Sequence, residues 1–214
     1  MNACFFDMDG TLIDSRADLA ATVNHTRRDF RLSELPLEEV LVHVGRGARY
    51  LMAHAIPEIE DFDSAIAVFR SHYAEHMLDT TVLYPGVKRT LETLRDRGWL
   101  LGVNTNKPGF ATRAILDHFG LSGLFGRAVV AGGDCAELKP SALPLEVCSG
   151  LLDGHVLTAS DWMVGDSWQD MDCAKNAGIK GAFCSFGFGQ LAHATCSVRL
   201  ERFEDLLFCL KDGV

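Results

Sequence analysis

Short apolar runs that alternate with helix-length amphipathic segments restrict the fold of this chain more than any other feature. We expect strands at the apolar runs of residues 3–6, 100–104, 128–131, 162–164 and 181–185. We expect helices at residues 87–97, 110–119, 143–151 and 169–177, with Gly98, Gly120 and Gly178 as helix ends. This alternation is typical of βα units and predicts an α/β fold with a parallel sheet.

One long segment interrupts the alternation directly after the first strand. Residues 15–82 show only helical patterns, at 17–30, 37–42, 48–55 and 63–78. The chain then reaches Pro85 and Gly86, which suit a turn and a possible hinge. We therefore predict two domains. Residues 1–14 and 83–214 form the sheet-containing core, and residues 15–82 form a helical cap inserted after the first strand.

The charge and cysteine content exclude several classes of protein. The 214-residue chain carries 20 basic and 29 acidic residues, a formal charge of −9, which argues against nucleic-acid binding. An anionic substrate would need local cations or a metal. Seven scattered cysteines without a C-x-x-C pair favour reduced thiols and a cytoplasmic location. No leader pattern and no apolar run near the roughly 18 residues of a membrane span are visible, so no membrane partner is expected.

The first strand is followed by two closely spaced carboxylates. Asp7 and Asp9 stand at i and i+2 in the sequence F-F-D-M-D-G-T-L, so on extended chain they point the same way, while Met8 points into the body. Gly10 then allows a sharp turn of the backbone. A lone D-x-D is weak evidence, because acidic residues at strand ends often serve only as helix caps.

Three further polar clusters follow later strands, and their joint occurrence strengthens the functional interpretation. The second cluster is T-N-K-P at residues 105–108, the third is Lys139-Pro140, and the fourth is G-D-S-W-Q-D at residues 165–170. The carboxyl ends of parallel strands lie at one edge of the sheet, so the four clusters can converge there. Hard oxygen ligands such as those of Asp166 and Asp170 suit Mg²⁺, which prefers few protein ligands.

Together, F-D-M-D-G-T-L-I-D, T-N-K-P, K-P and G-D-S-x-x-D resemble the motifs of the haloacid dehalogenase superfamily over essentially the whole chain. The resemblance implies a Rossmann-like core, and one branch of that superfamily carries a helical cap at the same place. Within that branch, residues 44–52 and 83–87 are similar to phosphoglycolate phosphatases. Pro140-Ser141-Ala142 departs from the usual Pro-x-Pro of that group.

The resemblance implies a catalytic role for each core motif. Asp7 would be the nucleophile that forms an aspartyl-phosphate, and Asp9 would exchange protons with the leaving group and with water. Lys139 would offset the repulsion between the nucleophile and the phosphate. Thr105 and Asn106 would bind the phosphate oxygens. The acid at Asp9 speaks against a dehalogenase, since a halide leaving group needs no proton.

The resemblance also implies Mg²⁺ as the cofactor. Asp7, Asp166 and the carbonyl group of Asp9 would bind the metal, and Asp170 would support it indirectly, through water or through a bond to another ligand.

Two patterns in the cap could also carry function. Gly45-Arg46-Gly47 is either a simple turn before a helix or a loop that brings Arg46 to the substrate, where a guanidinium can clamp a carboxylate. His72-Tyr73-Ala74-Glu75-His76 fits the H-x-x-E-H zinc pattern. No third ligand is evident in the sequence, so we assign this segment to an exposed helix face.

These patterns predict a Mg²⁺-dependent phosphomonoester hydrolase that acts on a small phosphorylated metabolite. Phosphoglycolate is the preferred candidate, because its carboxylate would satisfy Arg46. A sugar-phosphate or amino-sugar-phosphate phosphatase and a phosphomutase remain alternatives. A non-enzymatic binding protein is disfavoured, because every expected catalytic position is filled. The oligomeric state is not predicted.

Overall fold

The core is a six-stranded, fully parallel sheet with the order β5-β4-β1-β6-β7-β8. The computed structural model describes residues 1–57 and 59–211 of the chain. The strands of the sheet are β1 (Ala3–Phe6), β4 (Leu100–Pro108), β5 (Val129–Gly132), β6 (Trp162–Gly165), β7 (Lys180–Cys184) and β8 (Val198–Leu200). The strand β1 is central, with β4 and β6 as its neighbours, so residues that follow these strands meet at one edge.

Helices cover both faces of this sheet, as the alternation of side chains along β1 shows. Phe6 packs in the larger hydrophobic cluster, and Phe5 packs on the opposite face against Leu145 and Cys148. On the side of Phe6 lie α5 (Val87–Asp96), α6 (Gly109–His118), α7 (Ser122–Phe125), η1 (Phe203–Asp205) and α10 (Leu206–Cys209). On the side of Phe5 lie α8 (Leu143–Gly150) and α9 (Trp168–Asn176).

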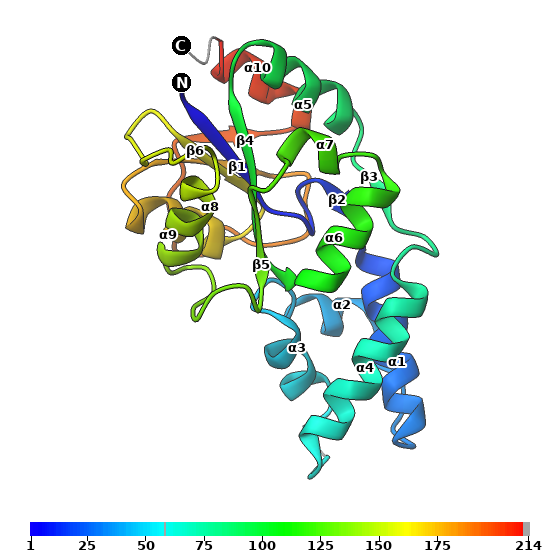
Figure 1. Cartoon of the computed structure of the whole chain (residues 1–214). Coiled ribbons are helices and arrows are strands. Elements are labelled where there is room, and N and C mark those ends of the chain that lie inside the picture. The colour runs from blue at the N-terminus through cyan, green and yellow to red at the C-terminus, as the bar shows by residue number, and fades with distance from the viewer. Residues whose placement is uncertain (58, 212–214) are drawn as a thin grey trace.

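The inserted segment forms four helices beyond the carboxyl end of the sheet (Figure 1). They are α1 (Arg16–Asp29), α2 (Leu37–Leu41), α3 (Ala48–Ala55) and α4 (Phe62–His76). The apolar side chains of Val23, Met52 and Phe69 are buried where these helices pack together. The insertion is therefore a helical cap on an α/β core.

A short antiparallel ribbon lies at the two ends of the insertion. The strand β2 (Ile13–Asp14) pairs with β3 (Val82–Leu83), next to the boundaries predicted for the two domains. The carboxylate of Asp18, at the start of α1, accepts hydrogen bonds from the backbone and hydroxyl groups of Thr80 and Thr81. Burial alone would raise the pKa of Asp18, but these hydrogen bonds lower it below its ordinary value.

The expected strands and helices correspond to the observed ones, with most ends shifted by one or two residues. The main difference is β4, which was expected to end at residue 104 but continues to Pro108. The pairing of β4 with β5 is irregular between Asn104 and Pro108, so the T-N-K-P cluster is a distorted strand end. The sequence patterns missed the ribbon and the short elements α7, β8, η1 and α10, each of four residues or fewer.

The cysteines are all free thiols in this structure, and four of the seven are buried, whereas Cys209 is exposed. Among the helices of the described residues, none has both the length and the apolar character that crossing a membrane requires.

Candidate active site

The loop after β1 places Asp7 and Asp9 at the carboxyl end of the central strand. Met8 between them is buried, as the alternation predicted. The backbone turns back at Gly10, whose φ is +75°, and the amide of Gly10 donates to the carbonyl of Ile13 at 2.9 Å. A Cβ atom at Gly10 would lie 1.8 Å from Oδ2 of Asp166, so glycine is required by both conformation and space.

Lys139 joins the clusters that follow β1, β4 and β6. Its Nζ lies 2.9 Å from Oδ1 of Asp7 and 2.7 Å from Oδ1 of Asp170, and it donates to the carbonyl of Asn104 at 2.8 Å. Burial disfavours the ammonium form, but Asp170 and Asp7 outweigh this effect and raise the pKa of Lys139. Lys139 is thus a fixed positive charge beside Asp7.

Three buried carboxylates, those of Asp7, Asp166 and Asp170, offer oxygen atoms that all lie within 4.8 Å of one another. Oδ2 of Asp166 accepts from the amides of Gly189 and Phe188 at 2.7 and 3.0 Å. Even so, burial and the neighbouring charges of Asp170 and Asp7 raise the pKa of Asp166 well above its usual range. A concentration of buried negative charge with hard oxygen donors fits a divalent cation such as Mg²⁺.

Asp170 is held by contacts within the protein. Its Oδ2 accepts from the amide and the hydroxyl of Ser167 at 3.0 and 2.5 Å, and these contacts belong to a capping box at the start of α9. Its Oδ1 accepts from Nζ of Lys139. Asp170 therefore orients Lys139 as well as contributing negative charge.

Thr105 and Asn106 lie at the end of β4 but use their side chains differently. Thr105 lines the cavity beside Asp7, and its hydroxyl accepts from the amide of Lys107 at 3.2 Å. The amide side chain of Asn106 donates to the carbonyls of Lys139 and Gly45 at 3.0 and 2.9 Å and accepts from the amide of Lys139. The side chain of Asn106 thus joins the core to the cap loop, and its amide group is already engaged rather than free to bind a phosphate.

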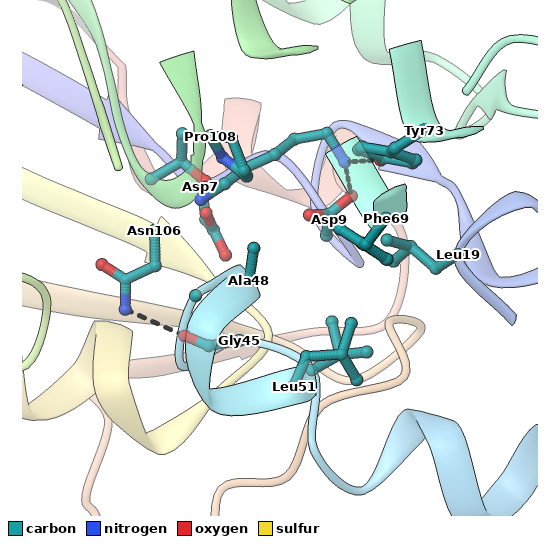
Figure 2. Close-up of a pocket in the computed structure, with 14 residues that line it drawn as sticks. Asp7, Asp9, Leu19, Gly45, Ala48, Leu51, Phe69, Tyr73, Asn106 and Pro108 are labelled. Carbon is teal, nitrogen blue, oxygen red and sulfur yellow. Dashed lines mark hydrogen bonds and ion pairs between the residues drawn. The ribbon is translucent and has the colours of Figure 1, made fainter. Parts of the chain in front are cut away.

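Lys107 and Tyr73 are two site residues that the sequence interpretation did not identify. Nζ of Lys107 lies 2.7 Å from Oδ1 of Asp9 and also donates to the hydroxyl of Tyr73 on α4 (Figure 2). Burial disfavours the charged form of Lys107, but Asp9 and Tyr73 outweigh this effect and raise the pKa of Lys107. For Tyr73, burial is the main effect, and it raises the pKa of the hydroxyl to about 12. Lys107 could have been predicted as a site residue, because it belongs to the T-N-K-P cluster. No sequence pattern around Tyr73 predicts that it lies at the site.

These groups line a cavity of about 40 Å³ between the core and the cap. The core contributes Asp7, Asp9, Thr105 and Lys107, and the cap covers them with apolar side chains and with the start of α3. Figure 2 shows Gly45 and Ala48 facing Asp7 across this space, with Leu51 beyond them. The volume leaves room for only a few water-sized groups beside Asp7.

Arg46 is not in the place predicted for it. Gly45 and Gly47 line the cavity, but the Arg46 guanidinium is exposed and lies 4.2 Å from the ring centroid of Tyr50 and 5.6 Å from that of Trp168. It also donates to the Tyr50 hydroxyl at 2.6 Å. Stacking on aromatic faces stabilises this outward position.

The start of α3 lines the cavity at Gly47 and Ala48 and carries backbone amides without acceptors. Leu51 is the first residue of this turn whose amide is bonded, to the carbonyl of Gly47 at 3.1 Å. Within the described chain, the amides of Ala48, Arg49 and Tyr50 have no acceptor, as is usual in the first turn of a helix. Such a helix end favours an anionic group.

Comparison with known proteins gives consistent relatives. The model of the family described as "Haloacid dehalogenase-like hydrolase" matches residues 4–184. A phosphoglycolate phosphatase of Pasteurella multocida is 36% identical over 86% of this chain and 85% of its own length, and one from Aquifex aeolicus is 34% identical over 97% and 95%. The crystal structure of a predicted phosphoglycolate phosphatase from Haemophilus somnus superposes with a TM-score of 0.91 at 29% identity, and covers 99% of this chain and 98% of that one.

Proposed function

Because this chain belongs to the haloacid dehalogenase-like hydrolase family, we propose that it hydrolyses phosphoglycolate through Asp7 with Mg²⁺ as cofactor. That the chain is a phosphoric monoester hydrolase follows from its family and from its phosphatase relatives. The observation that carries the choice of mechanism is the contact of Lys139 with Asp7, at the edge of a cluster of three buried carboxylates.

Asp7 is the proposed nucleophile. Lys139 binds its Oδ1, which leaves Oδ2 to attack the substrate phosphorus. A bond forms between this oxygen and phosphorus while the bond from phosphorus to the glycolate oxygen breaks. Lys139 and the Thr105 hydroxyl stabilise the negative charge of the transferring group.

Asp9 is the proposed proton donor and acceptor. Ser15 and Lys107 hold its Oδ1 at 2.5 and 2.7 Å, so Oδ2 can give a proton to the departing glycolate oxygen. In the second step, Asp9 takes a proton from the water that attacks phosphorus and releases inorganic phosphate from Asp7. The two steps together yield glycolate and phosphate.

The metal would be held by Asp7, Asp166 and the carbonyl of Asp9, with Asp170 in support. When bound, Mg²⁺ would reduce the repulsion between the Asp7 carboxylate and the substrate phosphate.

The cap supports a small substrate with a second negative charge. The cavity is small, about 40 Å³, and the start of α3, whose first amides have no acceptor within the described chain, lines it at Gly47 and Ala48. We propose that these amides bind the glycolate carboxylate, the role that the sequence had suggested for Arg46. Burying a carboxylate there would replace its water contacts with charge-assisted hydrogen bonds.

The test compares phosphoglycolate with hydroxyethyl phosphate, which has the same length but no carboxylate. Losing a charge-assisted hydrogen bond costs about 1.5–3 kcal/mol, so kcat/KM should be roughly 10- to 150-fold higher for phosphoglycolate. Arg46→Ala should keep this ratio, because Arg46 lies outside the cavity. A ratio near one, a preference for a sugar phosphate, or formation of an isomerised phosphate ester would contradict the proposal.

A further inference from the structure

Three histidines from two cap helices form a cluster that is separate from the carboxylate site. His72 and His76 lie one turn apart on α4, and α1 brings His25 against both of them. One ligand nitrogen from each residue lies within 4.8 Å of the other two. The ring of His25 is 5.5 Å from that of His72 and 5.2 Å from that of His76, centroid to centroid. His25 is thus a candidate for the third ligand, which could not be identified from the sequence around the H-x-x-E-H pattern.

Carboxylates hold the outer sides of the two α4 histidines. Nε2 of His72 lies 2.7 Å from Oδ2 of Asp29, and Nδ1 of His76 lies 2.9 Å from Oδ2 of Asp79. Histidines that bind a metal usually give their second ring nitrogen to a carboxylate, which fixes the ring and its tautomer. Among the described residues, Nδ1 of His72 and Nε2 of His76 have no hydrogen-bond partner.

The surrounding charges also suit a cation. Three carboxylates lie around the cluster, those of Asp29, Glu75 and Asp79, and Oε2 of Glu75 is 4.0 Å from Nε2 of His76. The positive charge of Arg28 is also nearby and would repel a cation.

We propose that His25, His72 and His76 bind a divalent transition-metal ion, Zn²⁺ being the expected species, that links α1 to α4. Imidazole ligands suit zinc, and three of them leave a fourth position for water or for Glu75. Zinc binds nitrogen at about 2.0–2.1 Å, so binding would bring the three half-buried rings closer together than they are in this structure. The bound ion would fix the helix that carries Tyr73 against the helix that carries Asp18. The proposal does not depend on the proposed substrate.

The test is a Zn²⁺ titration of the whole chain against a chromophoric chelator, with Mg²⁺ in large excess to occupy the carboxylate site. All proteins carry Cys209→Ser, because that exposed thiol could bind zinc itself. We expect His25→Gln and His72→Gln each to lose one tight site per chain relative to the parent. The matched control is His193→Gln, which removes an exposed histidine that is also paired with a carboxylate, Asp172, and it should retain the site.

A second readout guards against misfolded variants. One equivalent of Zn²⁺ should raise the thermal unfolding midpoint of the parent and of His193→Gln but not that of His25→Gln. Each variant should keep its Mg²⁺-dependent phosphatase activity, since the cluster lies outside the cavity. An unchanged zinc stoichiometry in folded His25→Gln, or a midpoint that rises equally in all proteins, would overturn the proposal.

Discussion

At the scale of single residues, one ammonium group faces three buried carboxylates. Lys139 pairs with Asp7 and Asp170, but Asp166 has only backbone amides as partners among the described residues. Excess buried negative charge is costly unless a cation neutralises it. This excess of buried negative charge is the basis of the metal site that we propose.

Replacing Asp166 by asparagine should stabilise the metal-free protein. The variant removes one charge from the cluster, and the amide oxygen can still accept from Phe188 and Gly189. In EDTA its thermal midpoint should rise, by about 2–4 °C for each kcal/mol of repulsion removed. Mg²⁺ should raise the midpoint of the wild type much more than that of Asp166→Asn. A variant that is less stable in EDTA, or that gains equally from Mg²⁺, would show that Asp166 does not form a metal site.

The Tyr73 hydroxyl contacts Lys107, which in turn contacts Asp9, so we expect Tyr73 to position these two groups. Tyr73→Phe leaves the Lys107 ammonium with Asp9 as its one remaining side-chain partner within the described residues. Losing a hydrogen bond to a buried charge costs about 1.5–3 kcal/mol, so kcat/KM should fall about ten-fold or more.

The matched control for Tyr73→Phe is Tyr50→Phe, which removes a cap hydroxyl that contacts exposed Arg46 instead. Its kcat/KM should change less than two-fold or so, because surface contacts contribute little. Equal effects of the two substitutions would show that the contact between Tyr73 and Lys107 does not serve catalysis.

At the scale of elements, Asp18 fastens the start of α1 to the chain that leaves the cap. Asp18 is 3% exposed, and its carboxylate accepts from Thr80 and Thr81. These bonds lower the pKa of Asp18 in the folded protein. The charge of Asp18 therefore stabilises the folded protein fully above the unfolded pKa of about 3.9, and this stabilisation is lost as the pH falls through the lower folded pKa.

Asp18→Asn should therefore lower the free energy of unfolding at pH 7 by about 1.5–3 kcal/mol. The difference from the wild type should shrink as the pH falls below about 4. Urea unfolding of both proteins at several pH values measures this directly. A difference that is constant with pH would mean that the charge of Asp18 contributes nothing to the junction.

At the scale of the whole molecule, local patterns were sufficient to predict the sheet, the cap and the convergence of four clusters. Strand and helix periods are local properties, and a parallel sheet brings the ends of its strands to one edge. The clusters that contain Asp7, Asp9, Thr105 and Lys139 were predicted from their places after strands, and the family resemblance singled out these four residues. The structure brings them together. Their chemical roles remain proposals.

The remaining features depend on contacts between distant segments, which local patterns do not encode. Tyr73 reaches Lys107, and His25 reaches His72, only because α4 packs on α1 beyond the carboxyl end of the sheet (Figure 1). The outward position of Arg46 depends on the rings of Tyr50 and Trp168, the second of which belongs to the core. Such pairings arise from tertiary packing and needed the structure.

The central claim is that the carboxylate of Asp7 is the nucleophile of a phosphoglycolate phosphatase. The most direct measurement is phosphate release from phosphoglycolate by wild type, Asp7→Asn and the surface control Asp96→Asn, with thermal melts to show that all three are folded. With Mg²⁺ present, we expect activity in the wild type and the control, and a loss of at least about a thousand-fold in Asp7→Asn, because an amide cannot form the acyl phosphate. Substantial turnover by folded Asp7→Asn, or no turnover of phosphoglycolate by the wild type, would contradict the account.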